Sequence, residues 1–138
     1  MKKVSFRQVP FAIFYVAALL ALAGCATGQS GKSVVSVPKG QEAVEMEASN
    51  FNFQPNEIQL SKKGTLKLNV KNTSSATHNI TIKNPRGEVI KSVDIPVGET
   101  VPVTVDLPEA GVYEFYCNKP FHSTMGMKGR IVVANGTS

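Results

Sequence analysis

Residues 116–129 read Tyr-Cys-Asn-Lys-Pro-Phe-His-Ser-Thr-Met-Gly-Met-Lys-Gly. This stretch carries a thiol at Cys117, an imidazole at His122 and a thioether at Met127, each five positions after the one before. The chain has two histidines, and the other one, His78, lies far upstream. Four candidate metal donors are therefore available if the fold brings His78 beside this loop.

The chemistry of these donors indicates copper. A thiolate, imidazoles and a weak thioether suit a copper ion that cycles between Cu(I) and Cu(II). Zinc is the competing metal, but structural zinc sites take four strong donors from Cys, His, Asp or Glu. A site without metal is a further alternative, because a free cysteine is often a buried core residue. We expect one copper ion per chain.

Length and charge limit the class of protein. The 138 residues are enough for one domain. The formal charge of +5 falls to about +2 if Lys2, Lys3 and Arg7 are removed with the N-terminal segment. This small excess, without a basic run in the sequence, argues against binding to nucleic acid.

Residues 1–24 have the pattern of a bacterial lipoprotein signal peptide. Basic residues precede an apolar run at residues 11–23, and this run is shorter than the about 20 residues that a membrane-spanning helix needs. It ends in Leu-Ala-Gly-Cys at residues 22–25, which resembles the lipobox of bacterial lipoproteins. The resemblance implies cleavage before Cys25 and lipid chains on its sulfur and amine, which would anchor the protein to a membrane.

We expect residues 25–41 to comprise the lipidated Cys25 and a flexible tether, because Gly, Ser, Thr, Lys and Val dominate without helical periodicity. The predicted location is the bacterial cell envelope, on the periplasmic or outer face of a membrane. Ala26 slightly favours the outer membrane over the inner one. A disulfide between Cys25 and Cys117 is not expected, because each cysteine has a more specific role.

Residues 42–138 show the period of two that is typical of β-strands. Val44, Met46 and Ala48 alternate with glutamates, and similar alternation recurs at residues 65–70 and 101–107. Further strands are predicted at residues 58–60, 79–83, 89–93, 112–117 and 129–134, with turn signals between them. This pattern predicts an all-β domain, an antiparallel β-sandwich or barrel of seven or eight strands. Pro102 should place its strand at an edge or at a bulge.

The alternation also points two donors inward. Cys117 shares a strand face with Tyr113 and Phe115. His78 begins another strand, on the face of Ile80 and Ile82. If the two strands run antiparallel, the end of one meets the start of the other, and the loop after Cys117 can deliver His122 and Met127. The pattern alone leaves this arrangement as a hypothesis.

Residues 116–133 resemble the C-terminal loop and last strand of cupredoxins, the blue (type 1) copper proteins, and are similar to those of plastocyanin-like proteins and rusticyanin. Residues 50–58, 77–80 and 111–117 add further matches, of which 50–58 alone would be weak, so the resemblance covers about residues 44–134. It implies a Greek-key cupredoxin fold with His78, Cys117 and His122 as trigonal copper ligands. Met127 would be the long axial ligand, and the additional Met125 a surface residue near the site.

The resemblance further implies that Asn79 ties the strand of His78 to the cysteine loop by hydrogen bonds. His122 would be the port for electrons, inside an apolar rim. The rim consists of Pro120, Phe121, Met125 and Gly126. A binuclear copper centre would need a second cysteine in the loop, where this chain has only Cys117.

These features predict a one-electron carrier and not an enzyme, since the sequence shows no nucleophile–base pair and no open metal position. The expected partners are redox proteins such as a c-type cytochrome or an oxidase, and the expected state is a monomer. Copper storage, delivery or resistance is the alternative function, and a metal-free anchored module that binds other proteins is a third.

Overall fold

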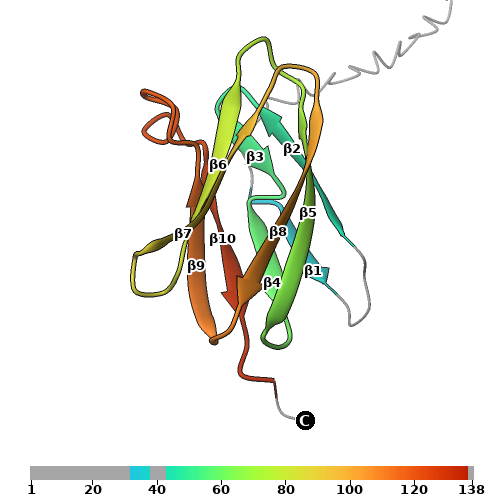
Figure 1. Cartoon of the computed structure of the whole chain (residues 1–138), viewed down its shortest axis with the longest axis vertical. Coiled ribbons are helices and arrows are strands. Elements are labelled where there is room, and N and C mark those ends of the chain that lie inside the picture. The colour runs from blue at the N-terminus through green and yellow to red at the C-terminus, as the bar shows by residue number, and fades with distance from the viewer. Residues whose placement is uncertain (1–31, 38–42, 137–138) are drawn as a thin grey trace, which may run out of the picture.

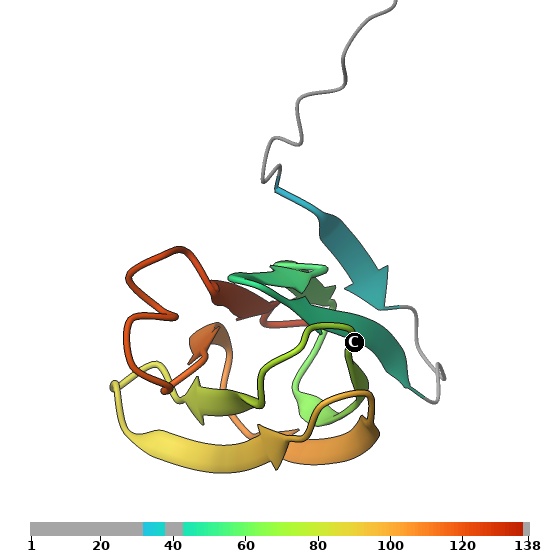
Figure 2. The ribbon, with the colours of Figure 1, turned by 90° about the horizontal axis from the view of Figure 1, so that it is seen from above.

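Alternating apolar side chains build two β-sheets that pack face to face (Figures 1 and 2). The computed structural model describes residues 32–37 and 43–136. A six-stranded sheet has the order β1-β4-β10-β9-β6-β7, and a four-stranded sheet has the order β3-β2-β5-β8. The strands are β1 (Val34–Val37), β2 (Val44–Ser49), β3 (Asn52–Gln54), β4 (Glu57–Leu60), β5 (Gly64–Asn72), β6 (His78–Lys83), β7 (Val89–Ile95), β8 (Thr100–Leu107), β9 (Gly111–Tyr116) and β10 (Lys128–Val133).

The predicted all-β fold is confirmed, with two differences in detail. All eight predicted strands form, and the short strands β1 and β3 bring the number to ten in the described ranges. The pairings β1–β4, β4–β10 and β2–β5 are parallel, so both sheets are mixed and not purely antiparallel. Parallel neighbours arise because the chain crosses between the sheets, and a later strand then lies beside an earlier one in the same direction.

The core lies between the sheets and follows the predicted alternation. Phe53 from one sheet meets Phe115 from the other edge-to-face, with ring centroids 5.5 Å apart. Pro102 lies on β8, which is an edge strand of the four-stranded sheet, as predicted. No helix in residues 32–37 and 43–136 is long and apolar enough to cross a membrane.

Strand β1 corrects the predicted extent of the tether. Val34–Val37 pair in parallel with β4, and Val35 and Val37 pack against the core. The Ser33 carbonyl accepts hydrogen bonds from the amides of Asn56 and Glu57, at 3.1 and 3.0 Å. Residues 34–37 are flanked by Gly, Lys, Ser and Pro, and their pairing with β4 is a distant contact that the local pattern does not show, which explains the wrong prediction at these residues. The predicted signal peptide, Cys25 and the rest of the tether lie outside the described residues.

Glu57 on β4 forms ion pairs with Lys32, two residues before β1, and with Arg130 on β10. Its carboxylate, 4% exposed, contacts Lys32 Nζ at 2.8 Å and the Arg130 guanidinium at 2.7 Å. Gln59 Nε2 donates a further hydrogen bond at 2.8 Å. Hydrogen bonds from Lys32, Gln59 and Arg130 lower the pKa of Glu57 from 4.5 to about 2, more than desolvation raises it. The charged carboxylate therefore stabilises the folded chain.

Replacement of the Glu57 carboxylate should lower the stability of the fold by an amount that depends on pH. Because the pKa of Glu57 is lowered on folding, its stabilisation is complete above pH 4.5 and is lost as the pH falls towards 2. The Glu57→Gln variant should unfold at a lower temperature than wild type at pH 7, and this gap should narrow between pH 4.5 and pH 2. Thermal unfolding followed by circular dichroism measures it.

Glu114→Gln is the matched control, since Glu114 is exposed on neighbouring β9 and makes no ion pair within the described ranges. Its unfolding temperature should stay close to wild type at every pH. A gap for Glu57→Gln that is constant with pH would contradict the role of the charge.

Candidate metal centre

Three donors converge at one end of the sandwich, as hypothesised. His78 begins β6, Cys117 directly follows β9, and His122 lies in the loop between β9 and β10. The His78 and His122 Nδ1 atoms are 3.2 Å apart, and Cys117 Sγ is 3.4 Å from His122 Nδ1. The three donor atoms all lie within 4.8 Å of one another. Both imidazoles therefore present Nδ1 to a common centre with the thiol.

The sheet register accounts for this convergence. Strands β6 and β9 are antiparallel, with Thr81 opposite Tyr116 and Ile82 opposite Phe115. The inward face of β9 continues to Cys117, and that of β6 begins with His78, and both side chains are fully buried. The end of one strand thus meets the start of the other, because the strands run in opposite directions.

Met127 closes the loop that carries His122. The Met127 amide donates to the His122 carbonyl at 3.0 Å, and the Cys117 amide donates to the Met127 carbonyl at 3.0 Å. Met127 is fully buried, whereas Met125 is 58% exposed. This difference favours Met127 over Met125 as the thioether at the site, in agreement with the prediction from spacing.

Ser74 holds the far side of the His78 ring. Its Oγ lies 2.7 Å from His78 Nε2, opposite the nitrogen that faces Cys117 and His122. Asn72 fixes this loop, because its Oδ1 accepts from the Ser74 amide at 2.9 Å and its Nδ2 donates to the Ala76 carbonyl at 2.8 Å. With Nδ1 free to bind metal, Nε2 carries the hydrogen and donates it to Ser74. Such a bond fixes both the tautomer and the orientation of a ligating histidine.

Burial favours the neutral form of His78. Desolvation of the fully buried ring, with a smaller contribution from the charge of neighbouring His122, lowers the pKa of His78 below its usual value. A neutral imidazole is the form that binds metal ions. His122 is only half-buried, and the Phe51 ring meets it edge-on with centroids 5.1 Å apart.

The predicted link from Asn79 to the cysteine loop is indirect. Asn79 Nδ2 donates to Asp94 Oδ1 on β7 at 3.1 Å, and Asp94 Oδ1 accepts from Lys119 Nζ of the loop at 2.9 Å. Asn79 lies on the opposite face of β6 from His78, and its cross-strand partner on β7 is Asp94, which explains the departure from the prediction. The two bonds, with Lys119 the larger cause, lower the pKa of Asp94.

The donor set and its spacing fit a copper ion. Three donors around one ion of zinc's size, with bonds of about 2.0 Å to nitrogen and about 2.3 Å to sulfur, would lie about 3.5 Å apart, and copper is a neighbouring metal of the same row. The separations of 3.2 and 3.4 Å are close to this value. Two imidazoles and a thiolate, with a thioether as a weak fourth donor, are the ligands of blue copper sites.

Comparisons with known proteins agree with the interpretation of these residues as a copper site. The family profile described as "Cupredoxin-like domain" matches residues 12–133. This chain belongs to the cupredoxin family. Copper is the cofactor of this cupredoxin, and His78, Cys117, His122 and Met127 form its type 1 site. No protein with a curated description matched the sequence.

Several solved structures share the cupredoxin fold. Dithionite-reduced auracyanin from Roseiflexus castenholzii has a TM-score of 0.61 and 24% identity, over 68% of this chain and 98% of its own. Auracyanin A from Chloroflexus aurantiacus, described as a "blue" copper protein, has a TM-score of 0.56 and 22% identity, over 73% and 99%. Reduced rusticyanin has a TM-score of 0.56 and 20% identity, over 72% and 83%.

The Ser74→Ala variant should weaken the site while leaving the fold intact. It removes the acceptor for His78 Nε2–H, so the ring loses the bond that orients it. Loss of such a partner typically lowers metal affinity by about 10- to 100-fold. Competition titration with a copper chelator measures this loss of affinity. The electron paramagnetic resonance spectrum of the Cu(II) form should show an altered hyperfine coupling to the copper nucleus.

Ser75→Ala is the matched control, because Ser75 is the exposed neighbour of Ser74. It should bind copper as wild type does. Equal affinity in both variants would show that Ser74 does not position His78.

Proposed function

We propose that this cupredoxin carries single electrons and is not an enzyme. The observation that supports it best is the contrast among the donors: His78, Cys117 and Met127 are fully buried, and His122 is half-exposed at the surface. Such a site shields its metal from substrates and leaves a single ligand edge open to a partner. The auracyanin and rusticyanin structures are described as reduced, so these relatives of the fold have a reduced state.

The chain holds its donors in fixed places. The bonds of Met127 to His122 and Cys117 close the loop, and Ser74 fixes His78. Bound copper supplies the Cu(I)/Cu(II) couple, for which a trigonal site with a weak axial ligand is a compromise between the preferences of the two states. Because these donors need not move when the charge changes, electron exchange should be fast.

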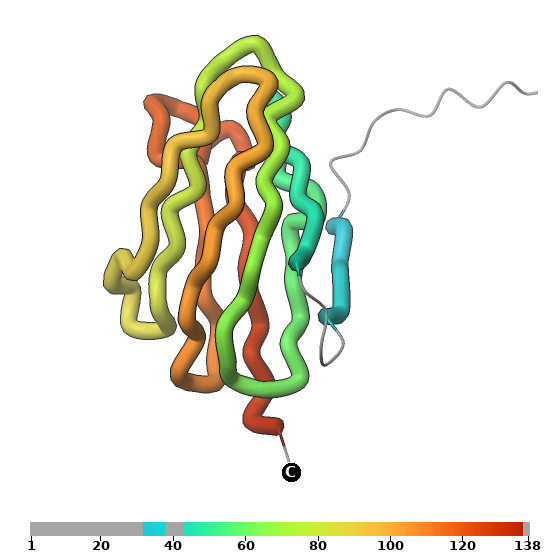
Figure 3. The backbone as a smooth tube through the Cα atoms, turned by 45° about the vertical axis from the view of Figure 1, so that its right-hand side comes forward, coloured from blue at the N-terminus to red at the C-terminus, as the bar shows by residue number. Residues whose placement is uncertain are grey.

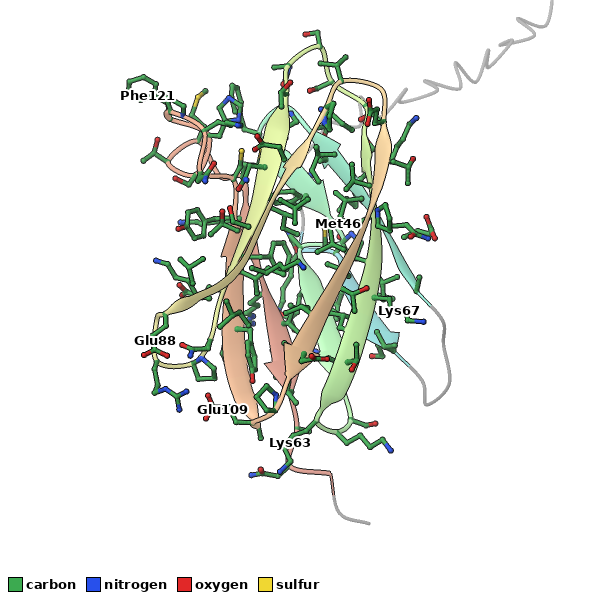
Figure 4. The ribbon with its side chains drawn as sticks, viewed as in Figure 1. Met46, Lys63, Lys67, Glu88, Glu109 and Phe121 are labelled. Atoms are coloured by element: carbon green, nitrogen blue, oxygen red, sulfur yellow. The ribbon has the colours of Figure 1, made fainter. Side chains whose placement is uncertain are left out.

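Exposed apolar residues close to His122 in the same loop support the proposed rim. Phe121 is 78% exposed and Met125 is 58% exposed, and Pro120 and Gly126 are exposed as well. Figure 4 shows Phe121 at the tip of the loop, directed away from the sandwich. Its φ of 66° is unusual for a bulky residue. A strained and exposed phenylalanine costs stability, which points to a functional role.

The small size of this rim fits a transient partner. Weak redox encounters bury less surface than stable complexes do. We propose a c-type cytochrome or an oxidase as partner, a monomeric carrier, and a lipid anchor on Cys25 that keeps the carrier at a membrane of the cell envelope. The lipobox-like residues 22–25 support this anchor.

Copper storage or delivery would use the same ligands but would require release of the ion. Full burial of His78, Cys117 and Met127 argues against easy release. Of the methionines that follow Cys25, Met46 and Met127 are buried and only Met125 is exposed, so no exposed methionine cluster exists to pass copper on.

A visible spectrum tests the copper site. The chain without its signal peptide should turn intensely blue with Cu(II), lose the colour with ascorbate, and regain it with an oxidant. Cys117→Ser should abolish the colour, because the thiolate is lost, whereas Cys25→Ser, the control at the other cysteine, should keep it. A colourless wild-type protein, or copper that leaves on reduction, would favour delivery or a metal-free module.

A rim variant tests the electron port. Phe121→Asn removes the exposed ring, and asparagine tolerates the left-handed backbone at this position. The blue absorption should stay unchanged, while electron exchange with a soluble c-type cytochrome, followed by stopped flow, should slow about fivefold, the loss expected for a modest interface contact. Val89→Asn, at an exposed valine on β7, is the control and should exchange at the wild-type rate. Equal rates in both variants would place the port elsewhere.

A further inference from the structure

The metal site occupies one end of the sandwich, here called the metal pole: the loop from Cys117 to Met127 and the turn at residues 96–99. Ile95 pairs with His78, so this turn lies at the same end as the site. The opposite end, the distal pole, contains the turns before β5 and β9. Figure 4 shows Phe121 at the metal pole and Lys63 and Glu109 at the distal pole.

Strand β1 starts on the side of the metal pole. Strand β10 leaves this pole at Lys128, which pairs with Tyr116 beside Cys117. Strands β4 and β1 run parallel to β10, so Val34 aligns with Glu57, and Glu57 with Arg130. Lys32 and Ser33 precede Val34 and therefore extend further towards the metal pole. Figure 3 shows β1 alongside the sandwich.

Without β1 the chain would leave the domain in the opposite direction. Strand β2 is parallel to β5, which starts at the distal pole, where Gly64 pairs with Leu107. The chain thus enters Val44 from the distal side. Strand β1 reverses this direction, because it runs antiparallel to β2 in the other sheet.

Strand β1 is held firmly enough to set this direction. Lys32 contacts the buried Glu57 carboxylate at 2.8 Å. The Ser33 amide donates to Asn56 Oδ1 at 3.0 Å. Val35 and Val37 pack on the core, while Val34 and Ser36 face solvent.

The length of chain before β1 limits the distance to an anchor. Cys25 and Lys32 are seven residues apart, and seven extended residues span at most about 25 Å. We infer that β1 turns the metal pole, and not the distal pole, towards the membrane, and that this pole fits a redox protein embedded in the same membrane. This inference rests on the lipid anchor proposed above.

A shared membrane also suits a small contact surface. Anchoring both proteins raises their effective concentration, so a weak encounter through the exposed rim of Phe121 and Met125 suffices if the geometry lets the two sites meet. If the distal pole faced the membrane, the anchor would hold the rim away from such a partner.

The orientation can be measured on the mature lipidated protein, which begins at Cys25, in vesicles of phosphatidylethanolamine and phosphatidylglycerol that contain a nickel-chelating lipid. Spin labels are attached to Val97→Cys at the metal pole or to Lys63→Cys at the distal pole, with Cys117 protected by Cu(I). The nickel headgroups should relax the label at position 97 several-fold more strongly than the label at position 63. Equal relaxation, or stronger relaxation at position 63, would overturn the orientation.

A variant in which β1 is released from the sandwich tests whether β1 causes the orientation. Val35→Asp with Val37→Asp places charges on the inward face of β1, while the control, Val34→Asp with Ser36→Asp, adds the same charges on the exposed face. The release variant should lose the difference between the two labels, and the control should keep it. Hydrogen exchange of the β1 amides verifies that β1 is released. If the two labels still differ in relaxation after this release, β1 does not set the orientation.

The partner is tested with washed membranes of the source bacterium against its soluble fraction. With NADH, membranes should reduce the oxidised blue protein, or with dioxygen they should oxidise the reduced blue protein, faster than the soluble fraction does. Release of β1 should slow this electron exchange with membranes about tenfold, because the two sites no longer meet readily, and should leave reduction by ascorbate unchanged. Faster exchange with the soluble fraction in both directions would overturn the membrane-embedded partner.

Two further outcomes separate this inference from the proposals on which it rests. A spin label at Thr124→Cys reports whether the rim enters the lipid. Relaxation of this label by oxygen dissolved in the acyl region would show that the rim binds lipid itself, and would overturn the proposal of a protein partner. Failure of the blue protein to float with vesicles would overturn the anchor and this inference with it, while the copper site would stand.

Discussion

The two hydrogen bonds of the Met127 backbone hold the metal centre together. They join the end of β9, the loop histidine and the start of β10, so Cys117 and His122 cannot separate without opening the loop. His78 reaches this loop only because β6 runs antiparallel to β9 in a single register. A slip by one residue would turn every side chain of β6 to the other face and remove His78 from the site. The position of the metal is therefore a property of the whole sheet.

Most of the site could be predicted because its residues carry strong local signals. The spacing of Cys117, His122 and Met127 lies within one loop, and period-two alternation assigned inward faces to Cys117 and His78. These signals depend on side-chain chemistry and on strand geometry, which a sequence displays directly. Eight of the ten strands were predictable for the same reason.

The remaining features depend on contacts between distant segments. Ser74 lies in a polar loop that resembles any turn, and only the folded chain shows that its hydroxyl meets His78 Nε2. The role of Asp94 as the bridge between Asn79 and Lys119 requires knowledge that β7 lies beside β6. Strand β1 lies among Gly, Ser, Lys and Pro and does not stand out, because it is held by contacts with Glu57 of β4 and with Asn56, which directly precedes β4. The parallel pairings likewise follow from sheet order, which alternation does not encode.

Burial of the Cys117 thiol matters for the folded protein before copper binds. In the cell envelope, the location proposed above, a free cysteine risks oxidation or linkage to another thiol, and susceptibility follows exposure. Cys117 has no exposed surface even without an ion beside it. The folded chain can therefore wait for its metal in an oxidising compartment without losing the sulfur that must bind it. Folding first and loading later is then a safe order of assembly.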